Sequence, residues 1–197
     1  MKSQNEETLD EAIERIIEEY EAHYRALGEL IVTALEPYRD IIDRIQKRLK
    51  DIDSIKRKME RKGIGLEQIR HQIRDIVGIR IITHFLSDIP VVLRKLRTLT
   101  ELDIGTEQDI EDYIATPQAT GYRSLHINAL YRKAVPCEIQ IRTSFQDGWA
   151  TKSHLLAYKM KEIPPRWQRH FRLLSDQLHL ADEIADLLRE ELLETMP

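Results

Sequence analysis

The sequence predicts an α/β (α+β) fold, in which a mixed β-sheet is flanked by helices and a long helix stands at each end of the chain. Three observations lead to this prediction. Apolar residues recur every three or four positions near both termini, β-branched runs occupy the middle, and prolines and glycines separate these runs. Helices followed by a sheet and then by further helices are typical of this fold class.

Apolar spacing predicts the helices of the first third. From Leu9 to Leu35, apolar side chains recur at three- and four-residue steps, which indicates one long amphipathic helix. A second helix is expected over residues 38–49. Ser54 is the expected N-cap of a short basic helix, which should end at Gly63 because glycine readily adopts the left-handed conformation at a helix C-terminus.

The middle of the chain predicts the sheet. The run VGIRIITHF, residues 77–85, is rich in β-branched residues and indicates a buried strand. An amphipathic helix is expected over residues 88–99. Three strand-like runs lie within residues 112–143, broken by turn-forming residues at 117–121 and 133–136.

Two helices are expected after the sheet. The first begins at Ser144 and runs to Lys159. The second follows Pro165, because the apolar residues from Leu174 to Leu192 recur at helical spacing.

Composition excludes several classes of protein. The chain has 197 residues, of which 42% are hydrophobic and 32% charged, so it is neither disordered nor collagen-like. No apolar stretch is long enough to span a bilayer, and the N-terminus lacks the apolar core of a signal peptide, so we expect a cytoplasmic protein without a membrane partner. Cys137 is the single cysteine and no histidine pair has metal-ligand spacing, so no structural zinc site is expected.

Charge is unevenly distributed along the chain. Residues 47–62 hold eight basic against three acidic residues, an excess of +5, whereas residues 1–46 hold five basic against twelve acidic residues, an excess of −7. A solvated helix face is the simpler interpretation of the basic block, and a surface that binds a small polyanion such as a nucleotide is the alternative. The net charge of −4 argues against broad binding to nucleic acid.

Side chains would have to bind any phosphate group, because no Walker loop is present and no GxGxxG follows a strand. Several fixed cations are needed for a triphosphate, and arginine offers a planar fork for two oxygens at once. The candidates are Arg48, Lys50, Lys58, Arg80, Arg123, Arg142 and Lys159.

Two carboxylates are candidates for catalysis. Strand alternation in CEIQIRT places Glu138, Gln140 and Arg142 on one face, which is either simply exposed or the wall of a cleft. Asp75 comes directly before the strand over 77–85. If Asp75 and Glu138 converge, their oxygens suit Mg²⁺ held jointly with substrate phosphates, and Glu138 can accept a proton from an attacking hydroxyl.

Five strings together resemble, in order and in spacing, the synthetase domain of RelA/SpoT proteins: RLKDIDSIKRKM, RDIVGIRII, DYIATPQATGYRSLH, EIQIRT and WATKSHLLAYK. The resemblance implies a nucleotidyltransferase-like fold and a small alarmone synthetase. Such enzymes transfer the β,γ-diphosphate of ATP to the ribose 3′-hydroxyl of GDP or GTP and release AMP. It also implies a helical arm over residues 1–44, a synthetase domain over 45–160 and a helical extension over 161–197.

The resemblance, carried over residue by residue, implies a site for ATP and for Mg²⁺ as cofactor. The implied ATP contacts are Arg48 and Lys50 on the adenine and Lys58 and Arg80 on the phosphates. Asp75 and Glu138 are the implied catalytic residues and metal ligands. Glu138 would also activate the 3′-hydroxyl.

The resemblance likewise implies a site for the acceptor. Tyr122 would stack on the acceptor base, with Arg123 and His126 as further contacts. Arg142 and His154 match motif positions to which the resemblance gives no fixed role.

Three positions depart from the family pattern. Glu111 and Gln118 stand where guanosine-using members generally have basic residues, and Ser153 stands where many have glutamate. The loss of two cations should weaken the capture of a GDP or GTP phosphate tail. The alternative is therefore a toxic relative that modifies the 3′-CCA end of tRNA and is neutralised by an antitoxin protein, and a third alternative is an inactive binding module. The long terminal helices also suggest a homo-oligomer, because small alarmone synthetases often assemble through them.

Overall fold

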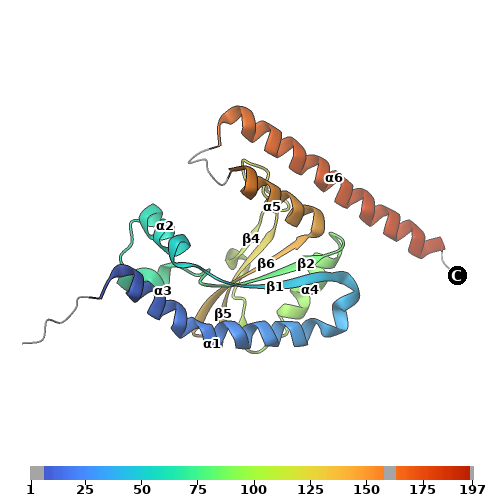
Figure 1. Cartoon of the computed structure of the whole chain (residues 1–197). Helices are drawn as coiled ribbons and strands as arrows, with labels where there is room; N and C mark the ends of the chain where they lie inside the picture. The colour runs from blue at the N-terminus through green and yellow to red at the C-terminus, as the bar shows by residue number, and fades with distance from the viewer. Residues whose placement is uncertain (1–6, 158–162, 196–197) are drawn as a thin grey trace, which may run out of the picture.

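A six-stranded mixed sheet forms the centre of the computed structural model, which describes residues 7–157 and 163–195. Helices α1 and α4 cover one side of the sheet, and α5 and α6 lie on the other (Figure 1). The prediction of a mixed sheet between helices, with long helices at both ends, is confirmed.

The first helix, α1 (Leu9–Leu35), has the predicted bounds. It begins with a capping box in which the Thr8 hydroxyl accepts from the Glu11 N–H and the Glu11 carboxylate accepts from the Thr8 N–H. Its apolar stripe, which includes the fully buried Ile13 and Ile31, packs into the core beneath the sheet. This helix therefore builds one wall of the hydrophobic core.

The helix expected over residues 38–49 is absent. A short 3₁₀ helix, η1 (Glu36–Ile41), leads instead into strand β1 (Ile42–Leu49), which pairs antiparallel with β2 (Val77–Thr83). The apolar spacing of β1 also fits a helix, but β2 is buried and needs a neighbour for its backbone groups on that edge. This pairing overrides the local pattern.

The basic helix α2 (Ile52–Lys62) begins one turn earlier than predicted. Asp51, and not Ser54, is the N-cap, because the Asp51 carboxylate accepts the N–H of Ser54 at 2.8 Å. The helix ends as expected at Gly63, whose φ of 63° is left-handed. The short helices η2 (Leu66–Gln68) and α3 (Ile69–Gln72) then lead to β2.

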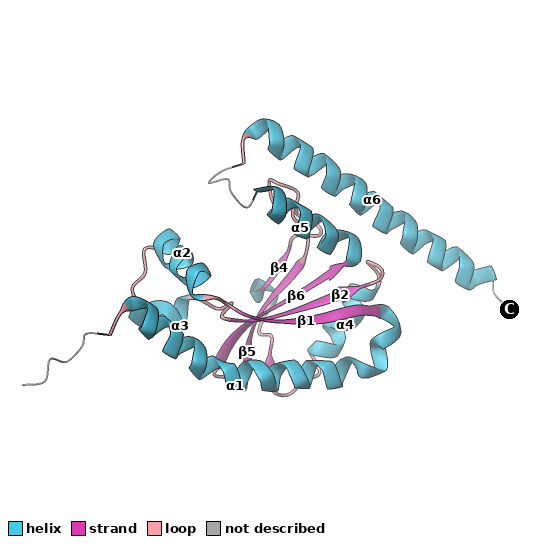
Figure 2. Cartoon of the chain, in the orientation of Figure 1, coloured by secondary structure: helices cyan, strands magenta, loops and turns pink. Residues whose placement is uncertain are grey.

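The sheet has the strand order β1-β2-β6-β5-β3, and β4 also pairs with β5 (Figure 2). The pair β2 and β6 is parallel, and the other pairs are antiparallel. The remaining elements are α4 (Asp88–Leu96), β3 (Leu102–Asp103), η3 (Glu107–Asp109), β4 (Ile110–Asp112), β5 (Leu125–Tyr131) and β6 (Val135–Thr143). The predicted run at 77–85 and the second and third runs of residues 112–143 are strands.

Strand β4 lies earlier than the first of those three runs. The carboxylate of Asp112 accepts the N–H groups of Ile114 and Ala115, at 2.9 and 3.0 Å, and so turns the chain at the point where the strand was expected to begin.

Two helices follow the sheet, α5 (Ser144–Ala157) and α6 (Pro165–Thr195). The predicted end of α5 at Lys159 lies outside the described residues. In α6 only Ser175 and Asp182 are fully buried, and Asp182 accepts from the Thr143 hydroxyl at 2.7 Å. Further along α6, Arg189 forms an ion pair of 2.6 Å with Asp88.

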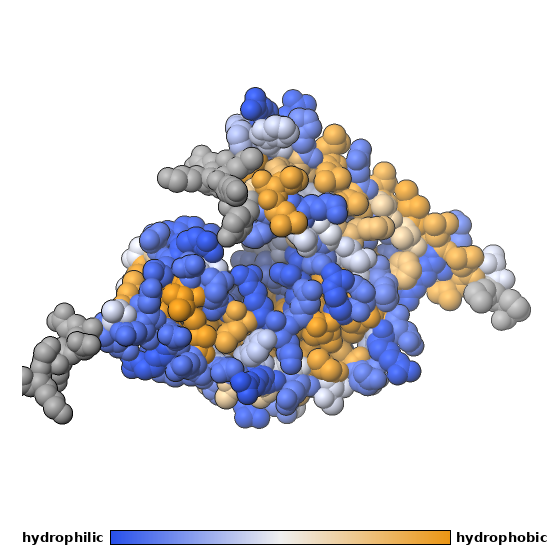
Figure 3. Space-filling view, in the orientation of Figure 1, coloured by the Kyte–Doolittle hydropathy of each residue, from blue (hydrophilic) through white to orange (hydrophobic). Residues whose placement is uncertain are grey.

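Helix α6 also carries exposed apolar side chains, most of them on the side away from Ser175 and Asp182, and Figure 3 shows apolar side chains along this helix. We call this surface the outer row. It consists of Leu173, Leu174, Leu180, Ile184, Leu187, Leu188, Leu192 and Leu193. Helix α6 thus turns its fully buried polar groups to the domain and leaves leucines in solvent.

Within the part of the chain that the structure describes, no helix has the length and apolar character that a membrane span requires.

Replacement of Asp182 by Asn tests the burial of this carboxyl group. Burial raises the pKa of Asp182 from 3.8 to about 6. The free energy of unfolding is therefore highest below about pH 3.8, where this carboxyl group is protonated, and it falls as the pH rises through about 6. Asp182→Asn removes this loss and should be more stable than the unchanged chain by about 3 kcal/mol at pH 8, with little difference at pH 4. Urea unfolding at both pH values measures the difference, and a difference independent of pH would contradict the burial of a charged group.

Candidate functional site

One face of the sheet is polar across its central strands. In β6 the odd-numbered Cys137, Ile139 and Ile141 are fully buried, so Glu138, Gln140 and Arg142 lie on the opposite face, as the alternation predicts. The register continues this face onto neighbouring strands, with Gly78 and Arg80 of β2 opposite Glu138 and Gln140, and His126 of β5 opposite Gln140. These polar groups share a surface and do not stand alone.

A first cavity of about 480 Å³ opens on this face. Its lining residues come from β1, β2, β6 and the segments beside them. They are Gln46, Lys47, Arg48, Lys50, Asp75, Gly78, Ile79, Arg80, Glu138 and Gln140. Gly78 lies opposite Glu138 and has no side chain, which leaves the space between Arg48 and Glu138 open.

Asp75 lies at the entrance of β2 between two ammonium groups. Its two carboxylate oxygens are 2.6 Å from Lys50 Nζ and 2.7 Å from Lys58 Nζ. The backbone N–H of Lys50 donates to the carbonyl of Ile76 at 2.9 Å, which holds β1 and β2 together at this end. Burial acts to raise the pKa of Asp75, but the hydrogen bonds and charges of Lys50 and Lys58 outweigh it and lower the pKa below its ordinary value.

Glu138 is held by two neighbours on the same face. One carboxylate oxygen accepts from Gln140 Nε2 at 2.6 Å, and the other is 3.4 Å from His126 Nδ1. Burial acts to raise the pKa of Glu138, but the hydrogen bonds from His126 and Gln140 outweigh it, so the pKa lies below its ordinary value. Glu138 is therefore an ionised acceptor at neutral pH.

The carboxylates of Asp75 and Glu138 fit a magnesium ion that is shared with a ligand. Both line the first cavity, and both offer the oxygen donors that Mg²⁺ prefers. The described residues contain no group of three or more Asp, Glu, His or Cys side chains able to hold a metal by themselves. Mg²⁺ commonly takes one or two carboxylates and completes its shell with water and phosphate oxygens, which matches this pair.

A cluster of arginines lies beside the first cavity around Asp147, a residue that sequence reasoning missed. Asp147 is buried at the start of α5, and its carboxylate accepts from both Arg44 and Arg142. Arg80 Nη1 is 3.8 Å from the same carboxylate. The only sequence signal was an acidic residue in the first turn of a helix that follows a strand.

The positive charge of Arg80 lies in an unfavourable environment in this cluster. Burial and the neighbouring charge of Arg142 lower the pKa of the Arg80 guanidinium below its ordinary value, against the opposing charge of Asp147. A guanidinium stays charged even so. Asp147 thus keeps several cations close together.

A second cavity of about 690 Å³ adjoins the first. Arg48, Arg80 and Gln140 line both cavities, so the two spaces meet at these side chains. The loop before β5 and helix α5 border the second cavity. Its other lining residues are Thr120, Tyr122, Arg142, Trp149, Ala150, Thr151, Ser153, His154, Leu155, Ala157 and Ile163.

Aromatic rings stand at the edge of the second cavity. The Tyr122 hydroxyl is 2.8 Å from His126 Nε2, and the ring of Tyr113, which sequence reasoning missed, contacts both rings edge-on. Burial raises the pKa of the Tyr122 hydroxyl, so it stays protonated. Through His126, this aromatic group connects to Glu138.

The structure does not bring every predicted site residue to the cavities. Arg123 lines neither of them, because its guanidinium contacts the carbonyl of Ile114 at 2.6 Å and the carboxylate of Asp176 at 2.9 Å. Lys58 lies behind the lining of the first cavity, on Asp75.

The three residues that depart from the family pattern lie near the aromatic group or on α5. The Glu111 carboxylate accepts from the Tyr113 hydroxyl at 3.0 Å, and Glu111 pairs with His126 across β4 and β5. The side chain of Gln118 is exposed. Ser153 lines the second cavity.

Comparison with known proteins identifies a family. The family model described as the region found in RelA / SpoT proteins matches residues 47–163, more than half of the chain. The GTP pyrophosphokinase YwaC of Bacillus subtilis is 38% identical over 161 residues, which cover 77% of this chain and 72% of that protein.

Solved structures of the same family share the fold. The small alarmone synthetase 1 of Bacillus subtilis has a TM-score of 0.84 and 32% identity, covering 94% of this chain and 100% of that chain. A structure of that enzyme bound to its product pppGpp has a TM-score of 0.81 and 33% identity, covering 92% of this chain and 98% of that chain.

Replacement of Asp147 by Ala tests the arginine cluster. The side chain of Arg142 is 2% exposed, and without Asp147 it would keep a buried charge without its acidic partner. We expect Asp147→Ala to lower the free energy of unfolding by about 3 kcal/mol, measured by urea unfolding. Asp43→Ala is the matched control, because Asp43 also pairs with Arg44 but lies nearer solvent and should contribute less than about 1 kcal/mol. Equal losses in the two variants would contradict this role of Asp147.

Proposed function

Because this chain belongs to the RelA/SpoT synthetase family, we propose that it transfers the β,γ-diphosphate of ATP to the ribose 3′-hydroxyl of GDP or GTP and releases AMP. One observation supports this above all. Two adjoining cavities meet at Arg48, Arg80 and Gln140, and an ionised Glu138 lines the first cavity and accepts a hydrogen bond from Gln140. Donor and acceptor nucleotides could thus bind side by side, with the Glu138 carboxylate as the general base near the wall that the two cavities share.

The first cavity is proposed as the ATP site. Arg48 offers a planar guanidinium to the adenine ring and Arg80 another to the phosphates, and Lys58 would add positive charge from behind Asp75. Lys50 was also expected on the adenine, but its ammonium lies on Asp75 and its side chain is 11% exposed. We therefore assign Lys50 to the phosphate end of the site, together with Lys58.

Glu138 acts on the hydroxyl that attacks. Its lowered pKa keeps it ionised, so it can orient the 3′-hydroxyl and accept its proton. The hydroxyl oxygen forms a bond to the β-phosphorus of ATP, while the bond from that phosphorus to the oxygen bridging the α-phosphate breaks, and AMP leaves. Bound Mg²⁺ would be held by Asp75 and Glu138 with phosphate oxygens and would supply charge neutralisation.

The second cavity is proposed as the acceptor site. The ring of Tyr122 lines it and is available to stack on a base, and His126 links that ring to Glu138. Arg142 and His154 line the same cavity and would contact the acceptor. In this proposal the acceptor base would lie beside Tyr122 and its ribose beside Glu138.

The 3′-CCA end of tRNA is the second candidate acceptor, and Glu111 is the observation that favours it. The Glu111 carboxylate stands beside the acceptor rings through its contact with the Tyr113 hydroxyl, and a negative charge there repels a 5′-diphosphate tail. The terminal adenosine of tRNA has no such tail. In that case the chain would be a translation inhibitor, and an antitoxin protein would be its partner.

A homo-oligomer is proposed as the working form of the chain. The outer row of α6 exposes eight apolar side chains along one helix, more than isolated surface leucines explain. A second copy of α6 would present the same stripe, so the two rows match each other around a two-fold axis.

Transfer of label from ATP radioactive in its γ-phosphate tests the reaction. GDP, GTP and deacylated tRNA are offered separately with Mg²⁺, and AMP is followed in parallel. We expect label on GDP or GTP and equal amounts of AMP; label on tRNA alone establishes the second candidate, and no AMP with any acceptor rejects both.

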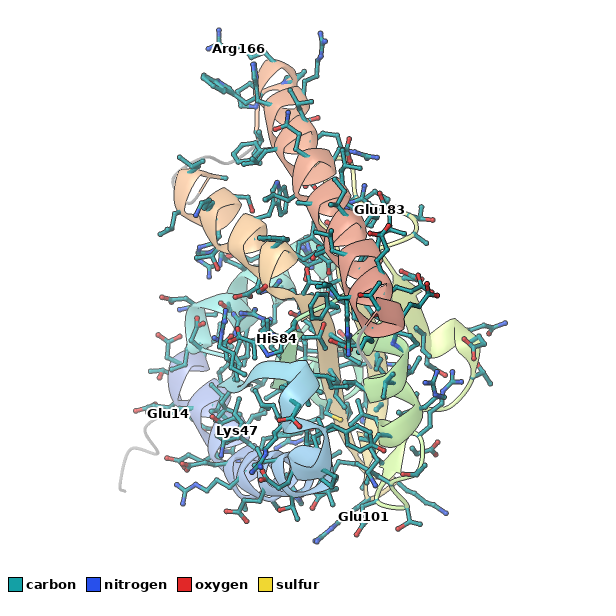
Figure 4. All side chains as sticks on the ribbon, turned by 90° about the vertical axis from the view of Figure 1, so that its right-hand side faces the viewer. Glu14, Lys47, His84, Glu101, Arg166 and Glu183 are labelled. Carbon is teal, nitrogen blue, oxygen red and sulfur yellow. The ribbon has the colours of Figure 1, made fainter. Side chains whose placement is uncertain are left out.

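Glu138→Gln should lower the rate at least tenfold with the fold intact. Glu101→Gln is the control, because Glu101 is exposed and lines neither cavity. It lies at the opposite end of the molecule from Arg166 (Figure 4), and its replacement should leave the rate unchanged.

Light scattering of the purified chain tests the assembly. We expect a mass of at least twice 23.2 kDa, and Leu187→Glu with Leu188→Glu should yield the monomer because buried carboxylates oppose contact between the rows. Leu130→Glu is the control, since Leu130 is also an exposed leucine but lies on β5, outside the outer row. A monomeric unchanged chain would overturn the proposal.

A further inference from the structure

Helix α6 holds the loop that carries Tyr122. We call residues 113–124 the acceptor loop; it connects β4 to β5 and lies against α6. Tyr122 stands between Gly121 and Arg123, and each of these two neighbours contacts α6 directly. The ring of Tyr122 itself faces the rings of Tyr113, His126 and Trp149.

The contact at Gly121 brings two backbones close together. Ser175 Oγ donates to the Gly121 carbonyl at 2.5 Å, and Ser175 is fully buried. A Cβ at position 121 would lie 2.7 Å from Ser175 Cβ and 3.1 Å from Arg172 Cα. The φ of Gly121 is also 91°, a left-handed value that favours glycine. The loop therefore approaches α6 as closely as only glycine permits.

The contact at Arg123 spans the loop. One end of its guanidinium donates to the Ile114 carbonyl on the opposite limb of the loop at 2.6 Å, and the other end pairs with Asp176 at 2.9 Å. The side chain of Arg123 is 9% exposed and that of Asp176 is 46% exposed, so the buried guanidinium is held by a carboxylate that solvent still reaches. Arg172 also contacts Asp176, at 3.1 Å, and fixes the carboxylate from the helix side. Arg123 thus ties both limbs of the loop to α6.

A third contact joins α6 to the other wall of the second cavity. The indole N–H of Trp149, on α5, donates to the carbonyl of Phe171 at 2.9 Å. The ring of Tyr122 lies 6.3 Å from the ring of Trp149, measured between centroids. Helix α6 is therefore attached on both sides of the Tyr122 ring, to the loop before β5 and to α5.

We propose that Ser175 and Asp176 are positioning residues for the acceptor, which they serve by holding the acceptor loop so that the Tyr122 ring stands ready at the second cavity. The inference rests on the proposed function for the identity of the ligand. Its physical basis is that a loop ordered before binding does not lose conformational freedom when the ligand arrives. Without these contacts the acceptor itself would have to order the loop, so its binding would weaken while ATP binding stays the same.

Kinetics of Asp176→Ala measure this effect. We expect the KM for the acceptor nucleotide to rise about tenfold, which corresponds to about 1.4 kcal/mol, with the KM for ATP within twofold of the unchanged chain. Asp176→Glu keeps the charge and should recover most of the acceptor affinity. An unchanged acceptor KM, or an equal rise in the KM for ATP, would overturn the inference.

Asp186→Ala is the matched control on the same helix. The carboxylate of Asp186 also attaches α6 to the domain, because it accepts from the Ser87 N–H at 3.0 Å and the Ser87 hydroxyl at 2.6 Å, but it does not contact the acceptor loop. This variant should leave the acceptor KM unchanged. If it weakens the acceptor as much as Asp176→Ala does, general attachment of α6 matters and the specific role of Asp176 is wrong.

Hydrogen exchange of the free protein separates this inference from the proposed function. We expect the amides of residues 113–124 to exchange faster in Asp176→Ala than in the unchanged chain and in Asp186→Ala. This readout needs no acceptor, so it stands even if labelled phosphate reaches neither guanine nucleotide nor tRNA. Equal exchange in all three proteins would show that Asp176 does not hold the loop.

Discussion

The parallel pairing of β2 with β6 is the constraint on which the site depends. Its register sets Gly78 against Glu138 and Arg80 against Gln140, and it places Asp75, just before β2, at the same end of the sheet as Glu138. A shift of one residue would turn the polar row of β6 into the core and the isoleucines into solvent. Burial of those isoleucines therefore fixes the position of every charged group on the opposite face.

The shared wall between the cavities has a chemical consequence. Arg48, Arg80 and Gln140 border both spaces, so the reacting ends of two nucleotides would meet where cations are already gathered. Asp147 holds part of that charge in place from behind, through Arg142 and Arg44. Such a site stabilises negative charge by groups that need not move during the reaction, which suits the transfer of a diphosphate.

The sequence predicted those parts of the site that depend on local pattern. Alternation in β6 placed Glu138 and Arg142 correctly, because burial of one strand face leaves no other choice. Strand β1 was predicted as a helix, because its apolar spacing fits a helix as well as a strand. Its pairing with β2 determines that this segment is a strand. Asp147 was missed because its partners lie on other elements; Arg44, for example, is 103 positions away in the chain. Contacts of that kind depend on tertiary structure, and an acidic residue in the first turn of a helix is too common a local signal to reveal them.

The contacts that attach α6 to the domain affect how the chain unfolds. Its fully buried residues are polar, and most of its leucines already lie in solvent, so release of the helix from a single chain would expose little new apolar surface beyond Trp149 and the ring of Phe171 that packs on it. Urea acts in proportion to newly exposed surface and would hardly drive this step. Salt and changes in pH act on ion pairs and buried carboxyl groups, and they would loosen α6 while the sheet stays folded. The C-terminal helix is thus a separate unit of stability, governed by electrostatics, attached to a core governed by the hydrophobic effect.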